Sequence, residues 1–104
     1  MERIRVGKST ELRDGESKMV RAGNKEILVV RQGDRFYAID GWCSHMGASL
    51  EHGQVGDGTI RCRVHGAVFD LETGKVLQNL QAKDMRTYPV VVEGGDVFVE
   101  YAPI

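Results

Sequence analysis

The feature that most constrains this chain is a pair of short runs that hold both of its cysteines and two of its three histidines. The first run is Cys43-Ser44-His45, and the second, sixteen residues further on, is Cys62-Arg63-Val64-His65. Thiolate and imidazole groups are the side chains that bind soft and borderline transition metals. A cysteine and a histidine from each run can therefore converge on one metal centre, and the fold has to bring the two runs together.

Two other interpretations of these residues remain open. The cysteines could form a disulfide, but each has a histidine two or three residues away, which a disulfide does not need. In a reducing compartment such groupings more often bind metal. A structural zinc site of two cysteines and two histidines is the second alternative, because zinc takes these ligands readily. Zinc fingers usually pair like with like in each half, so the mixed spacing here fits them poorly.

With its flanks, the pattern resembles the Rieske iron–sulfur domain, and in particular the small Rieske-type ferredoxins. The flanking runs are Met46-Gly47-Ala48-Ser49-Leu50 and Gly66-Ala67-Val68-Phe69-Asp70, and the resemblance extends to Tyr88-Pro89-Val90. In a Rieske centre two histidines replace two cysteines on one iron of a [2Fe–2S] cluster. The resemblance implies that Cys43 and Cys62 hold one iron and that His45 and His65 hold the other.

Further residues are expected to surround such a cluster. They are Trp42, Met46, Gly47, Ala48, Val64, Gly66, Ala67 and Leu80. Gly47 and Gly66 would let the backbone approach the cluster closely and adopt positive φ. Trp42 and Met46 would either shield the cluster from water or simply pack as apolar loop residues. His52, the third histidine, is expected to be a solvated loop residue.

Several positions depart from the high-potential Rieske proteins. Ala48 and Val64 stand where those proteins have two cysteines joined as a disulfide, and Ala67 and Phe69 stand where they have hydroxyl donors to the cluster. Each missing donor removes stabilisation of the reduced cluster. The resemblance therefore implies a midpoint potential in the lower part of the Rieske range, nearer about −150 mV than +300 mV. Segment 79–84 contains no proline, although Rieske ferredoxins usually carry a proline-rich cover there.

The rest of the chain reads as short strands and turns. At 104 residues it is expected to form one domain, residues 1–104. Segment 26–31 is nearly continuous in apolar residues, which indicates a strand buried on both faces. Hairpin turns are predicted around Asn24, Gly33 and Asp40, and a final hairpin joins 86–93 to 96–101. The sequence thus predicts an all-β antiparallel sandwich or barrel-like base with a small inserted cluster-binding sub-domain, about residues 43–80.

Charge and hydropathy narrow the classes of partner. The net charge of −1 gives no general attraction to nucleic acid. No apolar run approaches the roughly 20 residues of a membrane span, and the N-terminus has no apolar signal segment. The cytoplasm is therefore the expected location, and a monomer the expected state.

The histidine count bears on function. After the cluster takes His45 and His65, only His52 is left, so the chain lacks the ligands for the mononuclear iron of an oxygenase. It also lacks the Gly-x-Gly-x-x-Gly fingerprint of a nucleotide-binding reductase. The prediction is a non-enzymatic one-electron carrier, which by resemblance passes electrons from a reductase to a terminal oxygenase. The alternatives are a small subunit of a larger redox enzyme of the nitrite-reductase kind, and a structural zinc protein.

Overall fold

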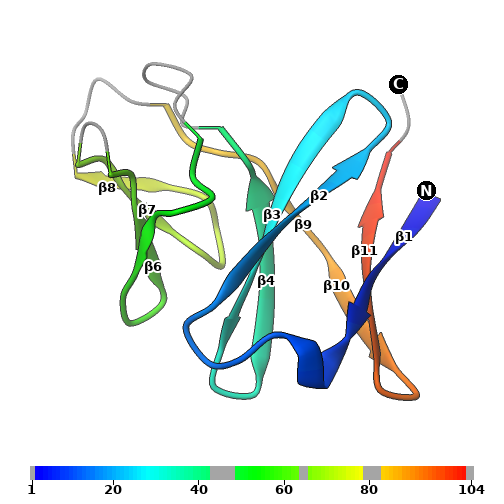
Figure 1. The fold of residues 1–104 in the computed structure, drawn as a ribbon. Helices are drawn as coiled ribbons and strands as arrows, with labels where there is room; N and C mark the ends of the chain where they lie inside the picture. The colour runs from blue at the N-terminus through cyan, green and yellow to red at the C-terminus, as the bar shows by residue number, and fades with distance from the viewer. Residues whose placement is uncertain (1, 43–48, 64–65, 79–82, 103–104) are drawn as a thin grey trace.

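The computed structural model describes residues 2–42, 49–63, 66–78 and 83–102, which build three antiparallel sheets (Figure 1). The first sheet has the order β1-β11-β10, from β1 (Glu2–Lys8), β11 (Asp96–Tyr101) and β10 (Val90–Glu93). The second has the order β2-β3-β4-β9, from β2 (Ser17–Ala22), β3 (Lys25–Gln32), β4 (Arg35–Asp40) and β9 (Thr87–Tyr88). The third has the order β5-β6-β7-β8, from β5 (Gln54–Val55), β6 (Thr59–Arg61), β7 (Val68–Asp70) and β8 (Val76–Gln78).

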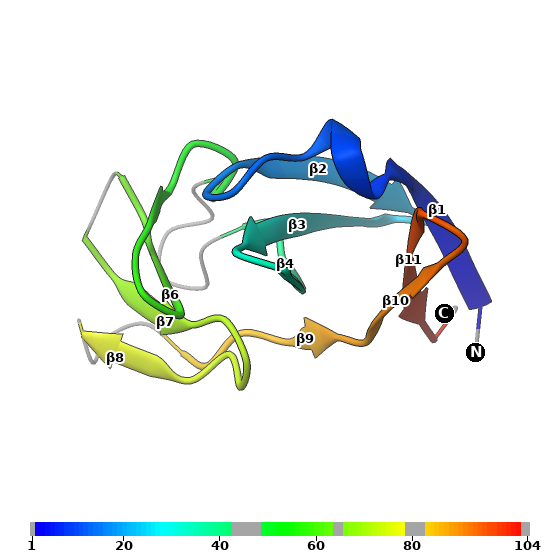
Figure 2. The same ribbon diagram turned by 90° about the horizontal axis from the view of Figure 1, so that it is seen from below.

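The three sheets follow one another along the molecule. Figure 2 shows the third sheet at one end, the second in the middle and the first at the other end, where both termini lie. A single 3₁₀ turn, η1 (Ser9–Glu11), joins β1 to β2 within the described part of the chain. The predicted all-β antiparallel fold is confirmed, and no described helix is long and apolar enough to cross a bilayer.

β3 is the wall between two hydrophobic cores. Side chains alternate across a strand, so Ile27 and Val29 face the core shared with the first sheet, whereas Leu28 and Val30 face the core shared with the third. All four are fully buried. Burial of such a side chain stabilises by about 1.5–3 kcal/mol, so a strand buried on both faces holds the two ends of the molecule together. The two-sided burial predicted for this segment is confirmed.

The core between the second and third sheets contains one of the predicted ligands. Cys62 is fully buried there together with Leu50, Ile60 and Phe69. Leu50 comes from the loop after β4, whereas the other three come from the β6–β7 hairpin and its turn. The same apolar cluster thus packs both predicted ligand regions against the base of the molecule.

Pro89 interrupts the first strand of the predicted final hairpin. The expected strand over 86–93 is divided at Pro89, where β9 pairs with β4 and β10 pairs with β11. Proline has no N–H to donate, so the ladder is interrupted at this residue and the chain passes from the second sheet to the first. The hairpin across Gly94 itself is confirmed.

Two of the three predicted turns are hairpin joints, and one prediction was wrong. Turns around Asn24 and Gly33 join β2 to β3 and β3 to β4. β4, however, runs through Asp40, and its other neighbour in the sheet is β9, far along the chain. The side chain of Asp40 explains the difference, because it accepts hydrogen bonds from Tyr88 Oη at 2.5 Å and from the Arg86 N–H at 3.2 Å. An aspartate that suggested a turn instead holds the returning segment against β4.

Hydrogen bonds from two side chains connect the third sheet and the loop before it to the second sheet. Gln32 Nε2 donates to the carbonyl of Gly56, and the amide oxygen of Gln32 accepts from the N–H of Gly58 at 2.7 Å. Ser17 Oγ adds a bond to the carbonyl of Glu51 at 3.1 Å. These contacts fix the β5–β6 turn relative to β2 and β3.

Candidate metal centre

The predicted site residues divide between the described and the undescribed parts of the chain. Of the four proposed ligands, Cys62 is described and lies directly after β6. Three of the surrounding residues, Trp42, Gly66 and Ala67, are also described. The remaining predicted residues lie outside the described ranges: Cys43, His45, Met46, Gly47, Ala48, Val64, His65 and Leu80.

Cys62 begins a tight turn between β6 and β7. The N–H of Gly66 donates to the carbonyl of Cys62 at 2.9 Å, and the N–H of Cys62 donates to the carbonyl of Ala67 at 2.8 Å. Gly66 has φ +71°, a conformation that residues with a Cβ rarely adopt. The positive φ predicted for Gly66 is therefore confirmed, and the turn brings Gly66 and Ala67 back to Cys62.

The stem of the first predicted ligand loop is also fixed by backbone contacts. Trp42 and Ser49 form an isolated antiparallel bridge, and the N–H of Leu50 donates to the carbonyl of Gly41 at 2.7 Å. The N–H of Gly41 donates in turn to the carbonyl of Glu26 at 2.9 Å. Trp42 and Ser49, the described residues on either side of segment 43–48, therefore lie side by side at the base.

A side chain on Gly41 would disturb this stem. A Cβ there would lie 2.9 Å from the carbonyl oxygen of Glu26 and closer still to the sulfur of Met19. Such distances are shorter than ordinary van der Waals contact. Glycine at this position is therefore required by close packing at the start of the loop.

The described side chains that pack with Cys62 in the core are apolar. Ala67 and Phe69, the positions without hydroxyl groups, are fully buried in the same cluster. The buried Tyr88, which has a hydroxyl, belongs to the other core. A soft sulfur donor in apolar surroundings, with backbone N–H groups close by, fits a bound iron–sulfur cluster.

No group of three or more metal-ligating side chains comes together among the described residues. Three of the four expected ligands lie outside those residues, so the four-ligand set stays a prediction. Within the described residues, Cys62, its turn and its apolar neighbours fit an iron–sulfur site.

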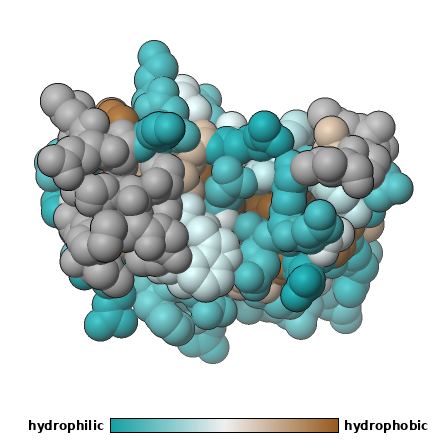
Figure 3. All heavy atoms as spheres, turned by 90° about the horizontal axis from the view of Figure 1, so that it is seen from above, coloured by the Kyte–Doolittle hydropathy of each residue, from teal (hydrophilic) through white to brown (hydrophobic). Residues whose placement is uncertain are grey.

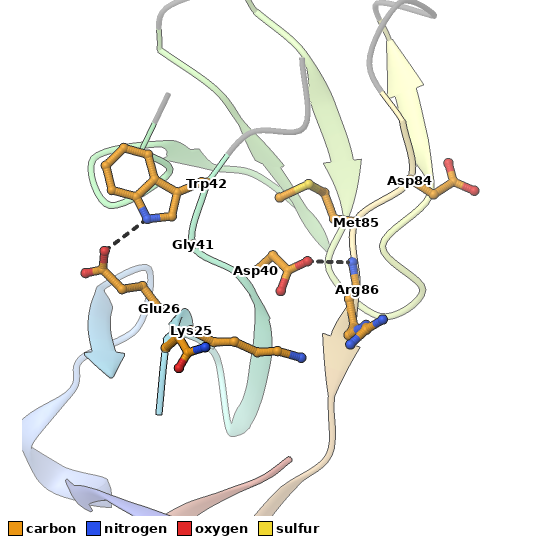
Figure 4. Close-up of a pocket in the computed structure, with 9 residues that line it drawn as sticks. Lys25, Glu26, Asp40, Gly41, Trp42, Asp84, Met85 and Arg86 are labelled. Atoms are coloured by element: carbon orange, nitrogen blue, oxygen red, sulfur yellow. Dashed lines mark hydrogen bonds between the residues drawn. The ribbon is translucent and has the colours of Figure 1, made fainter. Parts of the chain in front are cut away.

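Trp42 does not serve as a core residue. Its side chain is 47% exposed, and its indole N–H donates to Glu26 Oε1 at 3.1 Å. Figure 4 shows the ring beside a hollow of about 680 Å³ that Lys25, Asp40 and Arg86 also line. Trp42 is therefore no core residue, and its predicted shielding of the cluster stays a prediction. Figure 3 shows that the described side chains over this face are mostly hydrophilic.

Sequence reasoning missed the contacts that hold the returning segment. Asp40 joins Tyr88 and Arg86, as described above, and burial together with the hydrogen bond to Asp40 raises the pKa of the Tyr88 hydroxyl well above its ordinary value. No local signal marked this group, because its members are more than forty residues apart. His52, by contrast, is exposed as predicted, 3.9 Å from Glu51.

Comparison with known proteins supplies the family. A sequence model of the Rieske [2Fe-2S] domain matches residues 2–89. The ferredoxin subunit of 3-phenylpropionate/cinnamic acid dioxygenase from Escherichia coli O139:H28 is 44% identical over 75 residues, 71% of each chain.

Two solved structures agree with this match. The ferredoxin of carbazole 1,9a-dioxygenase from Nocardioides aromaticivorans IC177 superimposes with a TM-score of 0.90, at 33% identity over 95% of this chain and 97% of its own. A structure of the complex of reduced oxygenase and oxidised ferredoxin in carbazole 1,9a-dioxygenase superimposes with a TM-score of 0.88, at 31% identity over 93% and 91% of the two chains.

The family match covers both ligand runs and the described turn at Cys62. A family defined by a [2Fe-2S] cluster also accounts for a cysteine buried at a glycine-bearing turn that has no disulfide partner among the described residues. The chain belongs to the Rieske [2Fe-2S] domain family.

Proposed function

We propose that this protein is the ferredoxin component of a multicomponent dioxygenase, carrying one electron at a time from a reductase to a terminal oxygenase. The observation that carries this proposal is the 44% identity to a dioxygenase ferredoxin subunit, over a length that includes most of this chain. The complex of a related ferredoxin with its oxygenase supports the same direction of transfer. The chain is an electron carrier and not the oxygenase itself.

We propose that Cys43 and Cys62 hold one iron of the cluster and that His45 and His65 hold the other. The burial of Cys62 at the start of a closed turn supports this assignment. The cluster supplies reversible one-electron chemistry, and neutral imidazole ligands place its potential above that of an all-cysteine cluster. The protein contributes a dry sulfur side, formed by Ala67 and Phe69, and two anchored loops.

The proposed cluster-binding sub-domain covers residues 43–80 within the single domain 1–104. The third sheet, from β5 to β8, forms its described part, and Gln32 fixes it to the base. We further infer a cytoplasmic location, which suits a ferredoxin subunit like the relatives named above. The alternative, a small subunit of a nitrite-reductase-like enzyme, has less support. The three relatives named above, each more than 30% identical, come from dioxygenases.

Two of the three histidines, the proposed ligand His65 and the exposed His52, give a matched pair of variants. Iron, acid-labile sulfide and the electron paramagnetic resonance spectrum of the reduced protein are measured for the wild type, His65→Ala and His52→Ala. We expect two irons and two sulfides per chain and a rhombic signal in the wild type. His52→Ala should keep the irons, the sulfides and the signal, because His52 is exposed and is not a proposed ligand. His65→Ala removes a proposed ligand and should lose all three.

Two results would contradict the proposal. The first is one zinc per chain with no signal from the reduced protein, since zinc has no redox chemistry. The second is loss of the cluster in His52→Ala with retention in His65→Ala, which would reject the ligand assignment while leaving the family unaffected.

A further inference from the structure

Arg61 lies against the turn that carries two of the proposed ligands. It is the last residue of β6 and immediately precedes Cys62. Its guanidinium donates through Nη1 to the carbonyl of Gly66 at 3.3 Å, and through Nη2 to the side-chain oxygen of Gln78 at 3.5 Å. The side chain therefore spans from β6 across the end of the turn to β8.

The space around Gly66 agrees with this placement. A Cβ built on Gly66 would lie 3.6 Å from Arg61 Nη1, so the guanidinium is in van der Waals range of the backbone next to position 65. Two acceptors, one from the backbone of the turn and one from β8 on the far side of β7, hold the group there. The position of the charge is thus set by the hairpin and not by a flexible side chain alone.

The charge of Arg61 is not neutralised locally. Among the residues that the structure describes, no carboxylate lies within ion-pairing distance of its guanidinium. On the inner side of the turn, the surroundings of Cys62 are apolar and contain no buried polar side chain within the described residues. An apolar medium disfavours the additional negative charge of a reduced cluster. A cation held beside the turn offsets this cost by stabilising that charge.

We propose that Arg61 is a tuning residue, whose positive charge stabilises the reduced state of the cluster and raises its reduction potential. This inference rests on the proposed assignment of Cys62 and His65 as ligands. Arg61 partly replaces the hydroxyl donors that are absent at Ala67 and Phe69. It acts through its charge, from outside the ligand set, and makes no bond to iron.

The size of the effect follows from Coulomb's law. A unit charge about 8–12 Å away, at an effective dielectric constant of about 40 for an exposed group, changes the equilibrium constant for reduction about threefold to sixfold. For transfer of one electron this corresponds to about 28–46 mV, at 59 mV per tenfold change.

Four variants separate the charge from the shape of the side chain. Arg61→Gln removes the charge, and Arg61→Lys keeps it. Gln78→Glu leaves Arg61 in place but sets a carboxylate against its guanidinium, with the same change in net charge as Arg61→Gln. Arg35→Gln is the matched control, because Arg35 is exposed at the end of β4 opposite to the first ligand loop (Figure 1).

Reduction potentials of the cluster-loaded proteins are measured by redox titration in low salt. We expect Arg61→Gln and Gln78→Glu each to lower the equilibrium constant for reduction about threefold to sixfold. Arg61→Lys and Arg35→Gln should stay within twofold of the wild type. Where Arg61→Gln does not assemble a cluster, Gln78→Glu alone decides, because it retains Arg61.

The inference is overturned if Gln78→Glu stays within twofold of the wild type, or if Arg61→Lys falls as far as Arg61→Gln. The latter result would mean that the shape of the arginine matters and its charge does not. A wild-type protein with no one-electron couple would instead reject the proposed function, so the two failures are distinguishable.

Discussion

Replacement of Gly74 by alanine is the most severe single-methyl change that the structure predicts. Gly74 ends the turn between β7 and β8, with φ +78°. Its N–H donates to the carbonyl of Asp70 at 2.7 Å, and its carbonyl accepts from the N–H of Met85 at 2.7 Å. A Cβ on Gly74 would lie closer than 3.0 Å to the carbonyl oxygen of Met85. The turn and the returning segment therefore meet at this glycine with no room for a side chain.

The loss of stability has three parts. A positive φ costs a residue with a Cβ about 1–2 kcal/mol relative to glycine. Overpacking against a backbone oxygen adds about 1–3 kcal/mol, because main-chain atoms cannot rotate away as a side chain does. Loss of the hydrogen bond from Met85 adds about 1 kcal/mol. The total is about 3–6 kcal/mol, which is a large share of the roughly 5–15 kcal/mol that stabilises a domain.

Gly94→Ala is the matched control. Gly94 also has positive φ, +58°, but a Cβ there meets nothing within 4 Å. It lies in the β10–β11 turn of the first sheet, away from the proposed cluster. This variant should show the backbone cost alone, about 1–2 kcal/mol.

The assay is thermal unfolding of the cluster-loaded proteins, followed by circular dichroism at one fixed heating rate, with iron content measured beforehand. A loss of 1 kcal/mol lowers Tm by about 4–8 °C in a domain of this size. Gly74→Ala should therefore unfold at least about 8 °C below Gly94→Ala, and it should bind less iron. Equal transition temperatures for the two variants would refute the reasoning from close packing.

Three further predictions concern the Asp40 contacts and the sulfur environment. Tyr88→Phe removes the 2.5 Å bond to Asp40 and should lower the free energy of unfolding in urea by about 1.5 kcal/mol or more; an unchanged urea midpoint at pH 7 would contradict this. Burial and that bond raise the pKa of Tyr88, so its contribution is complete below the ordinary tyrosine value of 10.0 and is lost as the pH rises towards the raised value. The stability difference between wild type and Tyr88→Phe should therefore narrow from pH 9 to pH 11, and a constant difference would count against it. Ala67→Ser places a hydroxyl in the buried cluster beside Cys62 and should raise the midpoint potential in a redox titration; a lowered or unchanged potential would show that no donor reaches the sulfur.

The strands and the nature of the metal site could be predicted because their signals are local. The apolar run of β3 implies burial on both faces whatever its neighbours are, since side chains alternate across a strand. The pairing of cysteine with histidine in each run similarly restricts the ligand chemistry through residue type and spacing alone. Gly66 belongs to the same group, because the need for positive φ is a property of one residue.

Turn prediction failed where a residue served a distant partner. Asp40 has the composition of a turn, yet it continues β4 because Tyr88 and Arg86 bind its carboxylate. The sequence alone could indicate an interrupted strand at Pro89, because proline has no N–H. Only the strand pairings show that the chain passes there from one sheet to another.

The amino-acid sequence by itself determined most of the strand pattern, the cysteine–histidine spacing of each run and the absence of hydroxyl groups at Ala67 and Phe69, since these depend on residues within a few positions of one another. The tertiary structure decided what surrounds the donors: the apolar burial of Cys62, the bond from Arg61 to Gly66, and the attachment of the third sheet through Gln32. The physical reason is the separation along the chain of the atoms involved. Burial and electrostatic environment are sums over atoms brought close by folding, and the backbone path that brings them together is set by all three sheets at once.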